Sequence, residues 1–204
     1  MASNESSVSI TEIFSQSEFK PLVRYNRVVD GYYVAKDGRF YSTKTNKVLK
    51  PYTAHEKSGR VKEQSYSLSI PYGFFPEHPH KKREGRNVAK TPLSAHRAVA
   101  ETWMPVDTHP PEELADEWFE VITPEMVGQL RIPPKTRQWV KDTVVVDHKD
   151  DDPTNNSLDN LRYVTPKKNN SRRKELEMKL LAEKRDSMSE KDFDKEVERI
   201  LNEE

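Results

Sequence analysis

The sequence predicts an α+β protein, and three observations in its second half carry the prediction. Residues 143–146 (TVVV) are a short β-branched run, and residues 161–164 (LRYV) form a second apolar stretch. Both runs are typical of short buried strands. Thr165-Pro166 then places a hydroxyl residue at an N-cap and a proline at the first helical position, which is a strong helix start. In chain order these elements predict a compact ββα unit.

The first half of the chain predicts a small antiparallel β module. Residues 1–17 are rich in serine, and we expect them to be flexible. Within residues 18–75, Asp37-Gly38 is a favoured two-residue turn between runs of Tyr, Val and Phe. Residues 64–70 alternate polar and apolar side chains, as in a half-buried strand.

The ββα unit closes a longer region, residues 76–174. A loop rich in proline and histidine precedes a helix over residues 94–104, and an acidic insertion follows over residues 105–142. Within this insertion we predict two short helices, one near Pro111 and one near Pro124. Residues 175–204 read as a helical tail with narrow apolar stripes.

The ββα unit places three chemically suited side chains near one another. Asp147 and His148 follow the first strand, and Asn169 falls in the first turn of the helix. Carboxylate and carboxamide oxygens suit Mg²⁺ or Mn²⁺, and an imidazole can accept a proton near neutral pH. The pattern therefore indicates a site with one divalent ion that hydrolyses phosphodiester bonds.

At these residues the chain resembles the HNH endonucleases of the ββα-metal or His-Me finger group, and most closely the HNH homing endonucleases of bacteriophages. The motif residues are Asp147-His148, Asp150, Asn155-Asn156, residues 159–166 (DNLRYVTP) and Asn169. One departure is the loop DDDP at residues 150–153, where the family usually has Asp-Gly-Asn or a similar turn.

The resemblance implies separate roles for the motif residues. His148 would be the general base, Asp147 and Asn169 the metal ligands, and Asn160 a residue that braces the loop by hydrogen bonds. It also implies cleavage of double-stranded DNA to 5′-phosphate and 3′-hydroxyl ends, with one Mg²⁺ or Mn²⁺ per site. The alternatives are a DNA-binding regulator that has lost cleavage, and a restriction or host-DNA-degrading nuclease of the same fold.

Two upstream segments also resemble these nucleases. Residues 93–105 (LSAHRAVAETWMP) are similar to the helix that precedes the motif, and we expect His96 to support the site structurally. Residues 29–42 resemble an accessory module that helps phage homing nucleases hold DNA.

The formal net charge is zero, but the charges are unevenly distributed. Residues 18–99 hold 17 basic and 7 acidic side chains, whereas residues 100–130 hold 8 acids and no Lys or Arg. Phosphate contacts need locally clustered cations, so the basic regions are the candidate DNA contacts. The predicted DNA-binding residues are Arg39, Lys44, Lys47, Lys50, Lys81, Lys82, Arg83, Arg86, Lys167, Lys168, Arg172 and Arg173.

Composition excludes several other classes of protein. The chain has no cysteine, which excludes disulfides and Cys-based zinc knuckles. No apolar run approaches the length of a membrane span, so we expect a cytoplasmic protein, in the host cell if it is phage-encoded. Sequence patterns leave open whether it is a monomer or a homodimer.

Two segments keep alternatives open. The acidic insertion could pack against the catalytic unit through Trp118, Phe119 and Trp139, or bind a protein partner. The tail could fold back, pair with a second copy or form a small two-helix DNA-binding unit, although residues 175–204 hold 11 acids against 6 bases.

Overall fold

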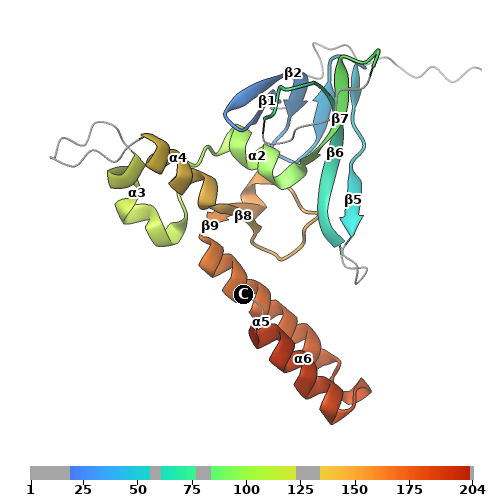
Figure 1. Cartoon of the computed structure of the whole chain (residues 1–204), viewed down its shortest axis with the longest axis vertical. Helices are drawn as coiled ribbons and strands as arrows, with labels where there is room; N and C mark the ends of the chain where they lie inside the picture. Colours follow the sequence, from blue (N-terminus) through green and yellow to red (C-terminus); the bar gives the residue numbers. More distant parts are fainter. Residues whose placement is uncertain (1–18, 56–60, 77–83, 123–133, 203–204) are drawn as a thin grey trace, which may run out of the picture. The chain divides into compact units, whose positions relative to one another are not determined.

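The computed structural model describes residues 19–55, 61–76, 84–122 and 134–202 (Figure 1). These described residues divide into two compact units, one within residues 1–109 and 148–162 and the other within residues 110–147 and 163–204. Strands and helices occupy largely separate parts of the chain, which confirms the predicted α+β class. The candidate DNA contacts Lys81, Lys82 and Arg83, and the helix predicted near Pro124, lie outside the described residues.

A four-stranded antiparallel sheet opens the first unit, in the order β1-β2-β3-β4. Its apolar side chains are buried on one face, with Leu22, Val34 and Phe40 fully inaccessible. The strands are β1 (Lys20–Arg24), β2 (Arg27–Val34), β3 (Phe40–Ser42) and β4 (Lys47–Val48).

The hairpin between β2 and β3 differs from its prediction. Val34 pairs with Phe40, so the connection is the five-residue loop 35–39 and not a two-residue turn at Asp37-Gly38. The Ala35 amide donates to the Arg39 carbonyl over 2.9 Å, and the Gly38 amide donates to the Ala35 carbonyl over 3.1 Å. These two bonds close a wider loop, in which Gly38 adopts a φ of +87°.

A second antiparallel sheet has the order β5-β6-β7. Its central strand confirms the predicted alternation, because Tyr66, Leu68 and Ile70 are buried and Ser67 is exposed. The strands are β5 (Tyr52–His55), β6 (Val61–Pro71) and β7 (Val88–Ser94).

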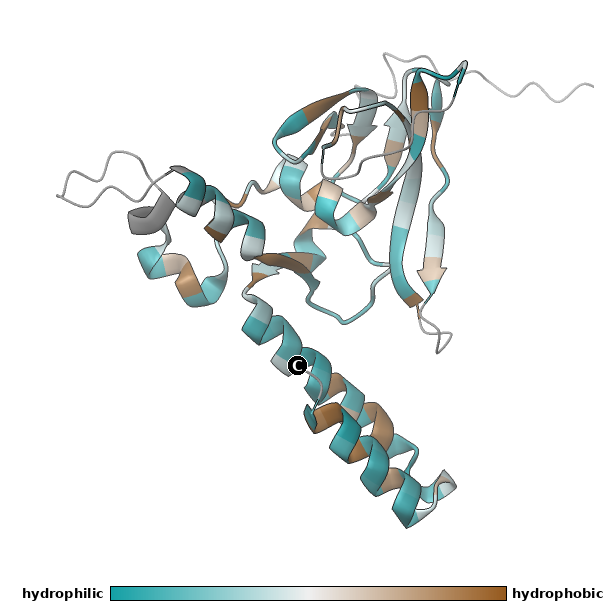
Figure 2. Cartoon of the chain, in the orientation of Figure 1, coloured by the Kyte–Doolittle hydropathy of each residue, from teal (hydrophilic) through white to brown (hydrophobic). Residues whose placement is uncertain are grey.

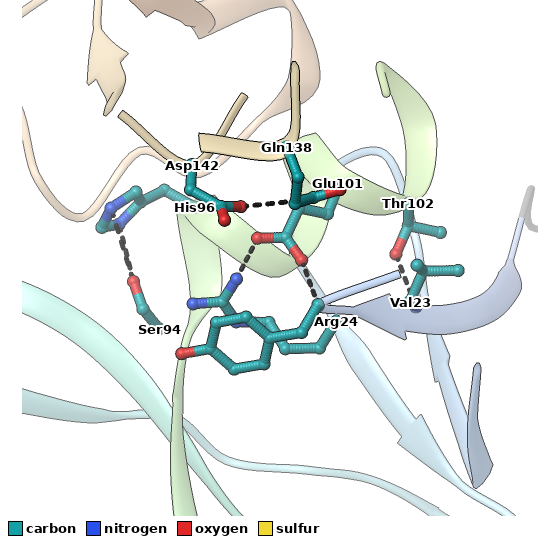
Figure 3. Close-up of polar contacts among 9 residues, drawn as sticks. Val23, Arg24, Ser94, His96, Glu101, Thr102, Gln138 and Asp142 are labelled. Carbon is teal, nitrogen blue, oxygen red and sulfur yellow. Dashed lines mark hydrogen bonds and ion pairs between the residues drawn. The ribbon is translucent and has the colours of Figure 1, made fainter. Parts of the chain in front are cut away.

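Helix α2 (Ala95–Trp103) joins the two sheets, because it packs against β1 and β2 of one and β6 and β7 of the other. Its buried face is made of small residues, which allow close approach to both sheets. Polar contacts fix its C-terminal half (Figure 3). Glu101 pairs with Arg24 and accepts the Tyr25 amide over 2.8 Å, and Thr102 accepts the Val23 amide over 3.0 Å.

The second unit contains the acidic segment and the tail. A 3-10 turn (Glu112–Leu114) leads into α3 (Ala115–Ile122), which bears out the first predicted helix. Helix α4 (Pro134–Thr143) was not predicted. Trp118 is buried, whereas Trp139 is 66% exposed.

Strands β8 (Val145–His148) and β9 (Leu161–Val164) form a two-stranded sheet, followed by α5 (Pro166–Glu183). The predicted ββα order is therefore confirmed. Thr165 caps α5 as expected, because its hydroxyl accepts the Lys168 amide over 3.3 Å and Pro166 holds the first helical position. A short 3-10 helix (Leu158–Asn160) precedes β9.

The tail folds back on itself, and its predicted pairing with a second copy and its predicted role as a two-helix DNA-binding unit stay predictions. After a 3-10 turn (Arg185–Ser187), α6 (Glu190–Asn202) lies alongside α5 (Figure 1). Both helices are largely hydrophilic, with isolated hydrophobic residues (Figure 2). Leu181 and Ile200 are buried, and Lys174 donates to the Leu201 carbonyl over 3.0 Å. None of the helices in the described part of the chain is long and apolar enough to cross a membrane.

Candidate active site

Strand β8 carries the first two candidate residues. The predicted strand stopped at residue 146, but the observed strand runs through Asp147 and His148. Consecutive residues of a strand point to opposite faces, so the two side chains enter different surroundings. Each side chain is partly buried. His148 belongs to the first unit and Asp147 to the second.

The imidazole of His148 is held by a buried asparagine. His148 Nε2 lies 3.2 Å from Oδ1 of Asn156, and Asn156 is only 4% exposed. Asn156 Nδ2 donates to the side-chain oxygen of Gln64 and to the Thr154 carbonyl, each over 3.1 Å. Both amide hydrogens of Asn156 are thereby used, and its oxygen is directed at His148.

This arrangement selects one tautomer of His148. A carboxamide oxygen only accepts hydrogen bonds, so Nε2 of His148 is the nitrogen that carries the hydrogen. In the neutral ring the lone pair then lies on Nδ1. The structure therefore leaves His148 Nδ1 as the nitrogen able to take a proton.

A second imidazole lies against His148. The ring centroids of His96 and His148 are 5.1 Å apart, and their planes meet at 65°. His96 Nδ1 lies 3.0 Å from the Ser94 hydroxyl (Figure 3). Burial, with smaller contributions from His148, Arg97 and Arg24, lowers the pKa of His96 from 6.5 to about 3. His96 is therefore a neutral neighbour of His148 at neutral pH.

This depressed pKa predicts a pH-dependent stability. Below pH 6.5 the unfolded chain protonates His96, whereas the folded protein keeps it neutral down to about pH 3. In this window the unfolded state binds more protons than the folded state. The unfolding free energy should therefore decrease as the pH is lowered, by at most about 1.4 kcal/mol per pH unit from this group. Urea unfolding between about pH 4 and 6 should give a shallower slope for His96→Gln than for wild type. The exposed His109→Gln is the matched control, and equal slopes for all three proteins would contradict the assignment.

The loop after β8 is braced by Asn160. Its amide donates to Asp150 and to the Asn155 carbonyl, each over 2.8 Å, and its oxygen accepts the Asp150 amide over 3.1 Å. The Asn155 side chain also donates to Asp150 over 2.7 Å. Hydrogen bonds from the Asn155 side chain, the Asp152 amide and the Asn160 side chain, in that order, lower the pKa of Asp150 to about 2. Such a bonding pattern is the one expected of a loop-bracing asparagine.

The departure from the usual loop sequence is accommodated in the backbone. Asp151 has a φ of +63°, a left-handed conformation that Asp tolerates better than most residues. It stands in the segment where the family usually has glycine. The loop thus makes a positive-φ turn without a glycine.

In the second unit, Asp147 lies beside helix α5. Its Oδ2 is 2.8 Å from Nη1 of Arg172, and the two side chains are 14% and 20% exposed. Arg172 follows Asn169 by three residues, which places both on one side of the helix. The backbone amide of Asn169 donates to the Thr165 carbonyl over 3.0 Å, and its side chain is partly buried. Asp147 is therefore held on the helical face that carries Asn169.

The donor set of Asp147 and Asn169 fits a hard divalent cation that keeps several water or phosphate ligands. In the described ranges, no cluster of three or more His, Cys, Asp or Glu side chains is arranged to hold a metal ion. One carboxylate with one carboxamide is consistent with that result, because Mg²⁺ rarely uses an all-protein cage.

The predicted DNA contacts have different local settings. Lys47, Lys50, Arg86, Lys167 and Lys168 are exposed. Lys44 donates to the Ser69 carbonyl over 3.2 Å, and Arg39 pairs with Asp37 over 2.6 Å. Arg173 lies 4.0 Å from Glu177, and Arg172 is paired with Asp147.

Two partnerships were not predicted from sequence. Gln64 contacts Asn156 across 92 positions of the chain, and no local pattern marks it. Arg172 was predicted as a phosphate contact, and its ion pair with Asp147 was not foreseen. Its position one turn after Asn169 was the available signal.

Comparisons with known proteins agree with the motif. Residues 138–171 match the family described as HNH endonuclease, and this segment contains Asp147, His148, Asn160 and Asn169. No curated protein matches the chain significantly. Among solved structures, the chain is similar to one described as "DNA binding and cleavage by the HNH homing endonuclease I-HmuI", with 23% identity and a TM-score of 0.36. The alignment covers 74% of this chain and 55% of that chain, so this chain spans about half of the other's length.

The family match agrees with the HNH resemblance predicted from the motif. The segment that carries Asp147, His148 and Asn169 is similar to HNH endonucleases.

Proposed function

We propose that this protein is a metal-dependent endonuclease that hydrolyses double-stranded DNA, and that it is a homing endonuclease of the bacteriophage type. The observation that carries the proposal is the setting of His148. Within a segment of the HNH family, its imidazole is bonded through Nε2 to Asn156, and its Nδ1 is left to accept a proton.

His148 would act as the general base of the reaction. Nδ1 takes a proton from a water molecule, whose oxygen attacks the phosphorus atom as the bond to the 3′ oxygen breaks. The products are a 5′-phosphate and a 3′-hydroxyl. Asn156 keeps the opposite nitrogen protonated, and neutral His96 adds no positive charge next to the base.

Asp147 and Asn169 would hold the divalent ion. When bound, such an ion supplies Lewis-acid stabilisation of the charge that develops on the phosphate and the leaving oxygen. The Arg172 guanidinium beside Asp147 fixes that carboxylate in position. The exposed cations Lys167 and Lys168 lie in the first turn of the same helix and would contact the DNA backbone.

Plasmid nicking tests the metal-dependent reaction. Wild-type protein should convert supercoiled DNA to the open form with Mg²⁺ and not with EDTA. Asn169→Ala should lower the rate by about 10²-fold or more, because one of two protein ligands is lost. The adjacent, exposed Asn170 provides the matched control, and Asn170→Ala should cut at the wild-type rate. If wild type leaves plasmid intact with Mg²⁺ and Mn²⁺ on varied substrates, the nuclease proposal fails in favour of a non-cleaving DNA-binding protein.

Mapping the cuts tests the homing proposal separately. A homing enzyme should cut a phage genome at one or a few sites. Scattered cleavage would instead indicate a degradative or restriction nuclease of the same fold.

A further inference from the structure

The β-rich part of the chain contributes directly to the surroundings of His148. Gln64 lies on β6, the central strand of the second sheet, 84 positions before His148. Its side-chain oxygen accepts a hydrogen bond from Nδ2 of Asn156 over 3.1 Å. Asn156 in turn presents its oxygen to His148 Nε2. A continuous path of side-chain hydrogen bonds therefore runs from β6 to the candidate base.

The path leaves Nδ1 of His148 able to take a proton only when the oxygen of the Asn156 amide faces His148 Nε2. If the amide turned over, its NH₂ group would face His148 Nε2, and the tautomer with the hydrogen on Nδ1 would be favoured. Such a histidine could no longer take a proton at Nδ1. Gln64 and the Thr154 carbonyl are the two acceptors that oppose this rotation.

The contact between the rings of His148 and His96 is also supported by the second sheet. Ser65, next to Gln64 on β6, pairs with Ser94 at the end of β7. The Ser94 hydroxyl bonds His96, whose ring lies against His148. The contacts of the His148 ring with Asn156 and with His96 are thus linked to two neighbouring positions of β6, Gln64 and Ser65.

The hairpin loop of the first sheet supports the same asparagine from another side. The Leu158 amide donates to the Lys36 carbonyl over 2.7 Å, and the Tyr66 hydroxyl donates to the Gly38 carbonyl over 3.1 Å. The Cα of Gly38 approaches Asn156 so closely that a Cβ there would lie 2.9 Å from the Asn156 Cβ. These contacts therefore hold the loop that carries Asn156 in one position.

We propose that Gln64 is a positioning residue for the nuclease reaction, acting through Asn156 to hold His148 in the tautomer that leaves Nδ1 free. The β-rich module then has a role in the chemistry in addition to any contact with DNA. This inference rests on the proposed role of His148 as the base.

The test uses the full chain and two substitutions at one position. Gln64→Met keeps a side chain of similar length but removes the acceptor, whereas Gln64→Glu keeps an oxygen that accepts from Asn156. Ser67→Ala, at an exposed position of the same strand, is the control. Two quantities are measured: steady-state nicking with Mg²⁺ over a range of pH, and the tautomer of His148 from side-chain ¹⁵N chemical shifts without DNA.

Gln64→Met should lower kcat about tenfold with little change in KM, and its ¹⁵N shifts should show a mixture of tautomers. Gln64→Glu should recover most of the rate and the single tautomer, and Ser67→Ala should match wild type. Wild-type rates and an unchanged tautomer in Gln64→Met would overturn the inference. If wild type does not cut DNA, the proposed function fails, and the ¹⁵N shifts still decide whether Gln64 orients His148.

Discussion

Replacing His148 with alanine should abolish nicking while DNA binding is retained. General-base catalysis contributes about 10²–10⁴-fold to a rate, and loss of the imidazole removes that contribution. The expected result is a fall of at least about 10²-fold in kcat with Mg²⁺, measured on supercoiled plasmid. Binding should change little, because the predicted phosphate contacts are lysines and arginines elsewhere on the chain.

His109→Ala is the matched control for that experiment. His109 is exposed, and its ring contacts the neighbouring Thr108 hydroxyl over 2.9 Å, away from the motif residues in sequence. It should cut like wild type. A His148→Ala protein that is folded, binds DNA and still nicks at the wild-type rate would rule out His148 as the base.

The second large effect is expected at Gly38, where stability and activity should fall together. Gly38 has a φ of +87°, and an added Cβ would lie 2.9 Å from the Asn156 Cβ and 3.2 Å from its carbonyl oxygen. Alanine there meets both a left-handed backbone, costing about 1–2 kcal/mol, and an overpacked contact, costing about 1–3 kcal/mol more. The strain falls on the residue that orients His148.

Gly73 separates the two contributions. Its φ is +76°, close to that of Gly38, but a Cβ would meet nothing within 4 Å. Gly73→Ala should therefore show the backbone cost alone in urea unfolding, with nicking unchanged. Gly38→Ala should be less stable than Gly73→Ala by about 1–3 kcal/mol and should nick more slowly. Equal stabilities and equal rates would show that the hairpin loop does not support the Asn156 loop.

Much of the ββα unit could be predicted because its signals are local. The strand at residues 161–164 and the helix start at Thr165-Pro166 were found where they were expected, since β-branched runs and N-cap chemistry act over a few residues. Tyr66, Leu68 and Ile70 likewise follow the period-two burial that their alternation predicted. The bounds of the first strand and the width of the 35–39 loop were less accurate, because hydrogen bonds that local composition does not specify decide them.

The sequence by itself determined which chemistry is available: a carboxylate, an imidazole and a carboxamide at the spacing of an HNH endonuclease. Only the tertiary structure decided how those groups are held. It paired Asp147 with Arg172, and it placed Gln64 and Asn156, 92 positions apart, in the hydrogen-bond path to His148. The physical reason is that such contacts depend on how sheets and helices pack, and packing joins residues that leave no common pattern along the chain.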